Sequence, residues 1–500
     1  GSRQPDIVDL MMGLVWKLST LGALLCLAPG HLAQDGPTEA SLLSNESFNA
    51  ICESCYCETG YPYLIDCSGR DLATLPTELE WFRQNSDIEV IMDRNNMFYL
   101  TSVDGPREIT KLSFRHNKIK RIALSAFMEL PRLAILDLAY NFLPTSALSK
   151  DVFQGPYSET GFMQLNLTCL DLSYNSIHSL DKDTFDHVEG IRELYLDGNP
   201  LQVIDHQTGV AITTLRNLRV LSLAKTGLSN LPLELFDAFL NLHTINLASN
   251  SLLTVPDALR HARRLTSLTL SNNPVVSFDE TSFQGLDDLK ELSISEMSKL
   301  ERIDSYSFAS LRQLKTLHCS YNKKLEYISS KAFLTPDGFS DYLSEVHLND
   351  NSLKTLSSQM LRYDSLRIFN IQENPFVCDC RLAWIFDGFL KNLNDNSPQY
   401  TLNLDCKHPK ALEGTSFYGI SKSDLAPCTG DKDFGPYMTA TESSQHYTAV
   451  SVTVASVIFV LVIVVFGMLY FYKKARYSPT NPLTQQIRYV KAETDEKVDV

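Results

Sequence analysis

The sequence contains none of the short motifs that carry enzyme chemistry. No GxSxG nucleophile elbow, phosphate-binding P-loop or dinucleotide-binding GxGxxG run stands out. The 11 histidines are scattered, without the spacing of metal ligands. These absences predict a protein that is not an enzyme and that uses no metal or other cofactor.

Basic charge is also in short supply. The chain has 44 Lys and Arg residues against 59 Asp and Glu residues, which gives a net charge of −15. Residues 473–500 carry +2 and residues 1–33 are neutral, so residues 34–472 carry −17. A surface this acidic argues against nucleic acid and anionic glycans as general partners.

Cysteines are few but grouped. Eight of the 11 form two groups of four. The first group is Cys52, Cys55, Cys57 and Cys67, and the second is Cys378, Cys380, Cys406 and Cys428. Clustered cysteines can bind zinc, but this grouping also fits disulfides in an oxidising compartment, which we favour. Spacing alone leaves three connectivities open in each group.

Between the two cysteine groups, one pattern returns along the chain. Its clearest copy is Leu167-x-x-Leu170-x-Leu172-x-x-Asn175-x-Ile177, which matches the leucine-rich repeat consensus. Most steps are about 23–25 residues, which lies inside the range of this repeat class. The asparagine position falls at Asn95 in a weaker first copy, then at Asn117, Asn141, Asn175, Asn199, Thr226, Asn250, Asn273, Met297, Asn322, Asn351 and Asn374.

The residue types in each repeat predict an α/β solenoid, a leucine-rich repeat horseshoe of about 11–12 repeats. Leu170 and Leu172 alternate, so both face one side of a short strand, and stacked repeats bury that side as a continuous core of parallel strands. The asparagine amide is expected to satisfy backbone groups at the turn. Large aromatic rings are expected to fill the convex side; they are Phe127, Phe153, Phe185, Phe236, Phe283, Phe308 and Phe333.

Both cysteine groups resemble the flanks of extracellular leucine-rich repeat proteins. The run from Asn374 to Cys380, with Trp384 after it, is an especially close match to the C-terminal flank of that family. The resemblance implies first-to-third and second-to-fourth pairing. The pairs would be Cys52–Cys57, Cys55–Cys67, Cys378–Cys406 and Cys380–Cys428, which act as disulfide caps.

The two ends of the chain predict a membrane topology. Residues 1–33 combine a non-native start with a signal peptide, because a short apolar run follows Lys17. Residues 449–472 are uncharged and long enough to span a bilayer, and Lys473, Lys474 and Arg476 follow them. We therefore expect a single-pass plasma membrane protein with its N-terminus outside. The expected parts are a cap at 34–86, repeats at 87–376, a cap at 377–428, a stalk at 429–448, a transmembrane helix at 449–472 and a cytoplasmic tail at 473–500.

Outward-facing strand residues form the candidate ligand-binding surface. Aromatic rings with interleaved charges on the concave face suit protein binding, although such a face can equally be merely solvated. The candidates are Arg115, Asp137, Tyr140, Asp171, Tyr174, Glu193, Tyr195 and Asp197, with the three tyrosines expected in one row on consecutive repeats. Two longer-than-usual repeats predict loops at Gly155–Met163 and Pro336–Tyr342, on one edge, as the rival contact surface.

Four further sites complete the expectations. Asn45 and Asn166 lie in glycosylation acceptor patterns. Cys319, at a core position, is expected to be a buried free thiol. Cys169, at an outward position, is expected to be a partly covered free thiol, with a cross-link between chains as the alternative.

From Cys52 to Cys428 the chain resembles the ectodomains of single-pass leucine-rich repeat proteins. Its architecture, though not its residues, is similar to that of the tartan and capricious type of insect cell-surface protein. The resemblance implies recognition or adhesion through an extracellular protein partner or a membrane protein on a neighbouring cell; a homo-oligomer is left open. The alternative is a signalling or innate-immune co-receptor. The terminal Val498 and Val500 resemble a ligand of PDZ-domain scaffolds, which bind such ends by strand addition.

Overall fold

The computed structural model describes residues 49–58, 60–76, 87–105, 107–336, 338–386, 390 and 403–428. The signal peptide, Asn45, the stalk, the expected transmembrane helix and the tail with Val498 and Val500 lie outside these residues. The first of two compact units ends at Cys428. Within the described ranges, no helix is both long and apolar enough to cross a bilayer.

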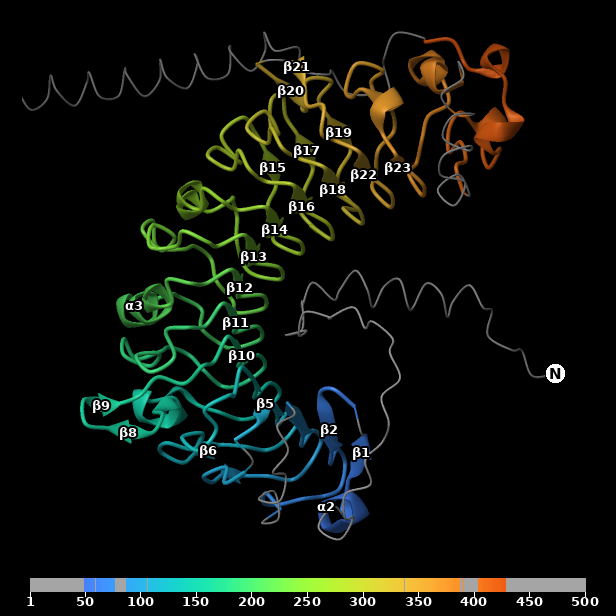
Figure 1. The fold of residues 1–500 in the computed structure, drawn as a ribbon. Coiled ribbons are helices and arrows are strands. Elements are labelled where there is room, and N and C mark those ends of the chain that lie inside the picture. The colour runs from blue at the N-terminus through green and yellow to red at the C-terminus, as the bar shows by residue number, and fades with distance from the viewer. Residues whose placement is uncertain are drawn as a thin grey trace, which may run out of the picture. The chain divides into compact units, whose positions relative to one another are not determined.

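One sheet organises the described part of the chain, and it contains 14 of its strands. Figure 1 shows these strands following one another along a curve, with the sheet on the inner side. In spatial order they are β1 (Tyr56–Glu58), β2 (Tyr63–Asp66), β3 (Ile88–Ile91), β5 (Ile109–Ser113), β7 (Ile135–Asp137), β10 (Cys169–Asp171), β11 (Glu193–Tyr195), β12 (Val220–Ser222), β13 (Thr244–Asn246), β14 (Ser267–Thr269), β16 (Glu291–Ser293), β18 (Thr316–His318), β22 (Glu345–His347) and β23 (Ile368–Asn370). Only the β1–β2 pair of this sheet is antiparallel. The strands from β3 to β23 correspond to the 12 expected repeats, so the solenoid prediction is confirmed.

Shorter elements occupy the connections between these strands. The small sheets are β4 (Tyr99–Leu100) with β6 (Arg121–Ile122), β8 (Tyr157–Ser158) with β9 (Gly161–Phe162), β15 (Ser277–Phe278) with β17 (Arg302–Ile303) and β19 (Tyr327–Ile328), and β20 (Leu334–Thr335) with β21 (Gly338–Phe339). The α-helices of the described residues are α2 (Asn49–Ser54) and α3 (His206–Thr214). Asp205 caps α3 by accepting a hydrogen bond from the Thr208 N–H. The 3₁₀ turns are Thr145–Ala147, Lys150–Phe153, Asp257–His261, Tyr363–Ser365, Cys380–Leu382, Lys410–Leu412, Phe417–Gly419 and Lys422–Asp424.

The asparagines form a ladder inside the solenoid, as the repeat pattern predicts. The Asn175 amide nitrogen donates to the carbonyls of Leu138 and Leu172, each at 3.0 Å. Its amide oxygen accepts from the Leu143 N–H at 2.9 Å. Each such amide ties its own turn to the preceding repeat, which satisfies backbone groups that water cannot reach. At Thr226 the shorter side chain donates to the Leu223 carbonyl of its own repeat at 2.7 Å and to the amide oxygen of Asn250, in the following repeat, at 3.1 Å. This side chain has no hydrogen bond to the preceding repeat among the described residues.

Two layers of apolar side chains fill the space behind the sheet. Leucines such as Leu170 and Leu172 are fully buried. The phenylalanines expected on the convex side are also buried, and several stack on one another. Phe127 and Phe153 have ring centroids 6.4 Å apart, and Phe308 and Phe333 have centroids 4.7 Å apart. This second layer keeps the convex side wider than the sheet, which makes the solenoid curve.

Disulfides hold both ends of the solenoid. At the N-terminal flank, Cys52 bonds Cys57 and Cys55 bonds Cys67. At the C-terminal flank, the disulfides are Cys378–Cys406 and Cys380–Cys428. Covered ends are required because the last repeat at either end has an apolar face with no neighbour.

The two remaining described cysteines differ from each other. Cys319 is a fully buried free thiol, as expected, and burial raises its pKa to about 12. Cys169 takes part in a disulfide and is buried. The expectation of a free thiol at Cys169 is therefore wrong.

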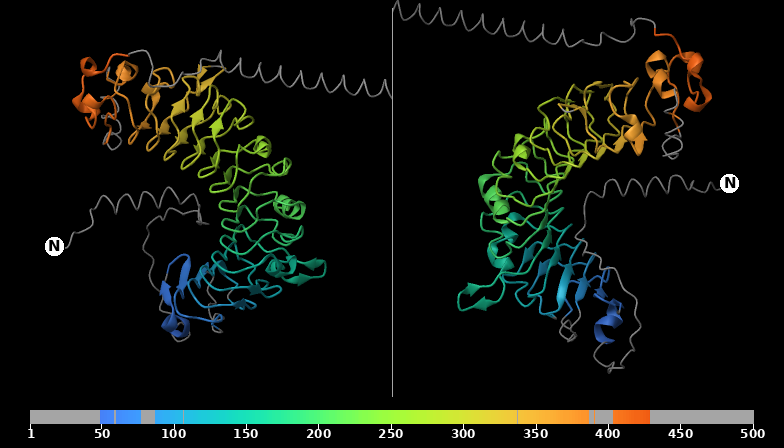
Figure 2. Two further views of the ribbon diagram at one scale, coloured as in Figure 1. Left: turned by 180° about the vertical axis from the view of Figure 1, so that it is seen from behind. Right: turned by 45° about the horizontal axis from the view of Figure 1, so that its top comes forward.

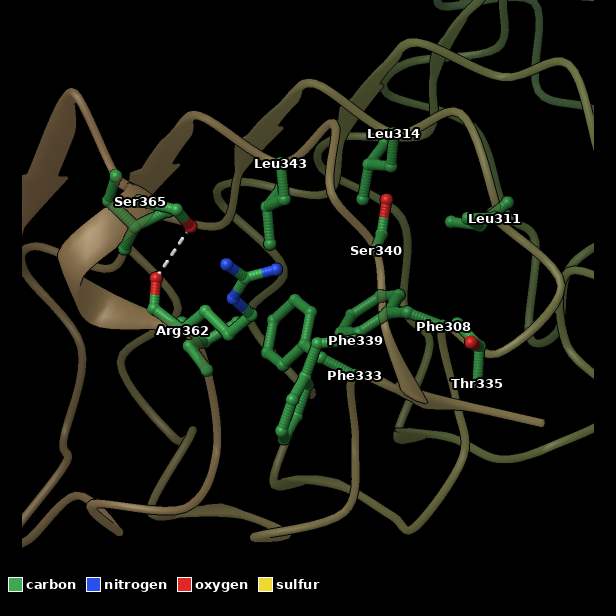
Figure 3. Close-up of a pocket in the computed structure, with 12 residues that line it drawn as sticks. Phe308, Leu311, Leu314, Phe333, Thr335, Phe339, Ser340, Leu343, Arg362 and Ser365 are labelled. Carbon is green, nitrogen blue, oxygen red and sulfur yellow. Dashed lines mark hydrogen bonds between the residues drawn. The ribbon is translucent and has the colours of Figure 1, made fainter. Parts of the chain in front are cut away.

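The two long repeats form hairpins. The β8–β9 hairpin lies in the Gly155–Met163 segment, and the β20–β21 hairpin begins just before Pro336. Both lie on the side of the solenoid away from the main sheet (Figures 1 and 2). Beneath β21, Phe339 packs near Phe333 and Arg362 around a cavity of about 20 Å³ (Figure 3). That volume holds roughly one water molecule, so the cavity is a packing gap and not a ligand pocket.

Candidate functional site

Strand register decides which candidate residues are neighbours on the concave face. Ser113 of β5 pairs with Asp137 of β7, which pairs with Asp171 of β10, which pairs with Tyr195 of β11. These residues therefore share one row across four repeats, with successive strands about 5 Å apart. Glu193 belongs to a parallel row that also contains Cys169.

Arg115 holds two carboxylates of this surface together. Its Nη1 atom lies 3.4 Å from Asp137 Oδ2 and 3.5 Å from Asp171 Oδ2. Burial raises the pKa of Asp171 to about 7, and the nearby negative charge of Asp137 adds to the effect. One guanidinium thus faces two carboxylates, and one of these gains or loses its proton close to physiological pH.

The neighbouring aspartates support the backbone. Asp197 accepts hydrogen bonds from Ser222 Oγ at 2.5 Å and from the Ala224 N–H at 2.7 Å. Asp93, which sequence reasoning missed, accepts from Ser113 Oγ at 2.6 Å and from the Arg115 N–H at 2.9 Å. Burial raises the pKa of both carboxyls above the usual value. Because these contacts join adjacent repeats, Asp197 stabilises the surface and is a weaker candidate for ligand contact.

Tyr195 does not join the other two tyrosines, so the expected row of three is wrong. Tyr195 aligns with Asp171 within the strands, whereas Tyr174 lies three residues later, at the turn. Only 3% of Tyr195 is exposed, and it packs with Cys169 and Val220. Its hydroxyl donates to Glu193 Oε2 at 3.1 Å. Tyr195 follows Tyr174 by 21 residues, which is shorter than the repeat. The sequence spacing therefore already indicates that the two tyrosines occupy different positions in their repeats.

At the turn after each strand, three aromatic rings form what we term the turn-edge ladder: His116, Tyr140 and Tyr174. The ring centroids of His116 and Tyr140 are 4.2 Å apart, and those of Tyr140 and Tyr174 are also 4.2 Å apart. The interplanar angles are 26° and 11°, so the rings are stacked. All three residues have φ between 54° and 56°, which places them at the same left-handed position of their turns.

Cations lie at the ladder's faces. The Arg115 guanidinium carbon is 4.7 Å from the Tyr140 ring centroid, and Lys225 Nζ is 5.8 Å from the Tyr174 centroid. Lys225 occupies the same turn position as Tyr174, two repeats further along. The repeat between them has Gly198 at this position, and the absence of a side chain there leaves room for Lys225 to reach the Tyr174 ring. Burial lowers the pKa of His116, and the nearby Arg115 and Arg94 lower it further, which favours the neutral ring. Lys225 and Gly198 are site residues that sequence reasoning missed; the repeat register would have revealed both.

The remaining site candidates have simpler surroundings. Asn166 is exposed, and its amide nitrogen donates to the Pro131 carbonyl at 2.8 Å. Its glycosylation stays a prediction. Among the described residues, no group of three or more His, Cys, Asp or Glu side chains is arranged to hold a metal ion.

Comparisons with known proteins agree with this fold. Residues 159–201, 216–275 and 263–323 match the family model described as Leucine rich repeat. Over 242 residues the chain is 27% identical to Tsukushi of Xenopus tropicalis, a match that covers 48% of this chain and 58% of that protein. It is 27% identical to podocan of Mus musculus, over 45% of this chain and 34% of that protein. It is also 31% identical to chaoptin of Drosophila melanogaster, over 37% of this chain and 15% of that protein.

The similarity to solved structures concerns the fold alone. A chain of the octameric complex of Latrophilin 3, Unc5D and FLRT2 (LRR) has a TM-score of 0.50 and 19% identity, over 74% of this chain and 96% of that chain. The present chain spans little more than half the length of Tsukushi. Fold, repeats and flank together are those of a leucine-rich repeat protein with a disulfide-bonded N-terminal flank, and part of its sequence is similar to Tsukushi and podocan.

Proposed function

We propose that this protein is a non-enzymatic cell-surface recognition or adhesion protein that binds an extracellular protein partner. The turn-edge ladder and the adjoining Arg115 network are the proposed contact surface. The observation that supports this most is the stack of His116, Tyr140 and Tyr174, because the solenoid core does not require it.

The chemistry of this surface suits a protein partner. Tyrosine and arginine are enriched among the residues that dominate protein interfaces. The stack holds its rings in place before binding, which reduces the conformational entropy that ordering them would cost. The solved complex of a protein with the same fold, with Latrophilin 3 and Unc5D, is a precedent for binding proteins and does not identify a partner here.

The proposed membrane topology sets the geometry of binding. The repeats would lie outside the cell, anchored by residues 449–472, and Val498 and Val500 would bind a PDZ-domain scaffold inside. If such a scaffold gathers the protein into clusters at the cell surface, deleting Val500 should disperse these clusters without changing the amount of protein at the surface.

Cells expressing the full-length chain provide the test. Proximity labelling on intact cells identifies candidate partners, and aggregation with partner-bearing cells measures adhesion. Tyr174→Ala should weaken partner binding by about 2 kcal/mol, roughly 30-fold, if the ring is a dominant contact. Tyr321→Ala is the matched control, because Tyr321 occupies the same left-handed turn position in a distant repeat.

The two variants separate the possible outcomes. Loss of binding with Tyr174→Ala but not with Tyr321→Ala supports the ladder as the site. A correctly folded Tyr174→Ala protein that binds normally would reject the ladder. Ligand-dependent recruitment of a second receptor without cell aggregation would favour the co-receptor function over adhesion.

A further inference from the structure

A short basic segment stands out against the acidic chain. Residues 115–121 contain four Lys or Arg residues and no Asp or Glu residue, although acidic residues outnumber basic ones, 59 to 44, in the whole sequence. Arg115 is engaged with carboxylates on the concave face. The other three cations, Lys118, Lys120 and Arg121, lie beyond the Asn117 turn on a different side of the repeat.

Aromatic rings lie beside these three cations. Strand β4 pairs with β6 so that Tyr99 is opposite Arg121. The Arg121 guanidinium carbon is 5.7 Å from the Tyr99 ring centroid, and Lys118 Nζ is 5.7 Å from the Phe98 centroid. Cations at this distance are attracted to the ring faces. We call Phe98, Tyr99, Lys118, Lys120 and Arg121 the basic edge patch.

The basic edge patch is open to solvent. Phe98 is 55% exposed and Tyr99 is 46% exposed, and the three cations are exposed as well. Phe142, at the same turn position as Lys118 one repeat later, is 53% exposed. Over the ranges that the structure describes, none of the three cations forms an ion pair with a carboxylate. Elsewhere on the surface, Lys111, Arg132 and Lys150 each have an acidic partner.

We propose that the basic edge patch binds a sulfated polysaccharide chain. Sulfate groups would pair with the three cations, and the exposed rings of Phe98 and Tyr99 would contact the apolar faces of sugar rings. A linear polyanion is narrow enough to touch the patch alone. A broad acidic protein surface, by contrast, would also come close to the rest of the ectodomain, which carries strong negative charge. The acidic residues there repel negative charge within a screening length of about 8 Å.

The basic edge patch shares no residue with the turn-edge ladder or with the Arg115 network. The acidic net charge argues against anionic glycans as general partners, but net charge averages over the whole surface. A linear polysaccharide interacts with one local patch and can bind there. Clusters of Lys and Arg of this length are typical of heparin-binding patches.

Binding to immobilised heparin tests the proposal with the full-length protein extracted in mild detergent. For a flexible polyanion, the logarithm of the binding constant falls by about 0.7 per cation contact for each tenfold rise in salt concentration. Three contacts therefore predict that binding weakens roughly 20-fold between about 50 and about 200 mM salt. The combined variant Lys118→Ala, Lys120→Ala and Arg121→Ala should lose this binding and its salt dependence. Because all three side chains are exposed, its thermal unfolding should match the wild type.

A matched variant separates local from general charge. Arg216, Arg263 and Arg264 are also exposed, and replacing all three with alanine removes the same charge elsewhere. That variant should bind heparin like the wild type. Phe98→Ala combined with Tyr99→Ala should weaken binding while keeping the salt dependence, because the cations remain.

Several results would overturn the proposal. They are undiminished heparin binding by the basic-patch variant, equal loss in the matched variant, and no measurable binding by the wild type at about 50 mM salt. Equally strong binding to desulfated heparin or to polyglutamate would also reject a sulfated polysaccharide as the ligand.

Discussion

The ring of Tyr174 lies directly over Gly198. A β-carbon added at residue 198 would be 2.5 Å from Tyr174 Cδ1, closer than any tolerated contact. Gly198 also has φ of +66°, a conformation that residues with a side chain rarely adopt. The glycine therefore serves two purposes: it closes the turn, and it leaves room for the ring that ends the turn-edge ladder.

Gly198→Ala should destabilise the protein and displace the Tyr174 ring. The left-handed backbone costs about 1–2 kcal/mol, and overpacking against the ring costs typically about 1–3 kcal/mol more. Gly414→Ala is the control, because Gly414 has φ of +73° with no atom within 4 Å of the added carbon. Chemical unfolding of both variants should show the larger loss at 198. In a Tyr174→Ala background the two losses should become similar, and a difference that persists there would mean that the ring is not the cause.

The asparagine ladder predicts opposite effects for two substitutions. Asn175→Thr leaves the Leu143 N–H without its partner inside the solenoid, while the Leu138 carbonyl loses one of its two donors and keeps the Asn141 amide. At about 1–3 kcal/mol for an unsatisfied buried group, the free energy of unfolding should fall by roughly that amount. Thr226→Asn restores the longer amide at a position where the threonine hydroxyl bonds its own repeat and the following one but not the preceding one, so it should stabilise by up to about 1 kcal/mol. Equal thermal shifts for the two variants, in the same direction, would contradict the ladder as a source of stability.

Much of this fold is readable from the sequence because one physical problem recurs in every repeat. Alternating leucines, a turn asparagine and a convex phenylalanine all follow from burying one strand face against the next. The concave surface is harder to predict, since each residue there depends on its neighbours across the sheet. Tyr195 shows this: it lies in the repeat after Tyr174, but the register places it within strand β11 and not at the turn, and Cys169 and Val220 bury it.

The C-terminal disulfides should be needed for folding and not for regulation. Cys380 and Cys428 are 48 residues apart, so their bond removes roughly 4 kcal/mol of loop entropy from the unfolded chain. Cys380→Ser should expose the end of the last repeat and cause retention in the secretory pathway, measured as reduced surface labelling at equal expression. Cys319→Ser is the comparison, because Cys319 is a buried free thiol whose loss breaks no disulfide. Normal surface levels of Cys380→Ser would show that the cap is dispensable.

The thiol of Cys319 should be inert in the folded protein. It is fully buried, and burial raises its pKa to about 12, so almost no thiolate forms at neutral pH. A maleimide reagent should label Cys319 only after denaturation, which mass spectrometry of the tryptic peptide would detect. Labelling within minutes under native conditions would instead mean that the repeats around β18 open readily.

Asp171 should make stability depend on pH around neutrality. Burial raises the pKa of its carboxyl to about 7, well above the value of 3.8 for an exposed aspartate. Between these values the folded state holds a proton that the unfolded state has lost. Stability from this group is therefore complete below about pH 4 and declines as pH rises towards 7, by up to about 1.4 kcal/mol per pH unit. Asp171→Asn removes the titration and keeps an oxygen that can accept from the Ser173 N–H. Urea unfolding at pH 5 and pH 8 should show that the gain in stability from Asp171→Asn is larger at pH 8. A gain that is larger at pH 5 would mean that Arg115 outweighs burial and keeps this carboxylate charged.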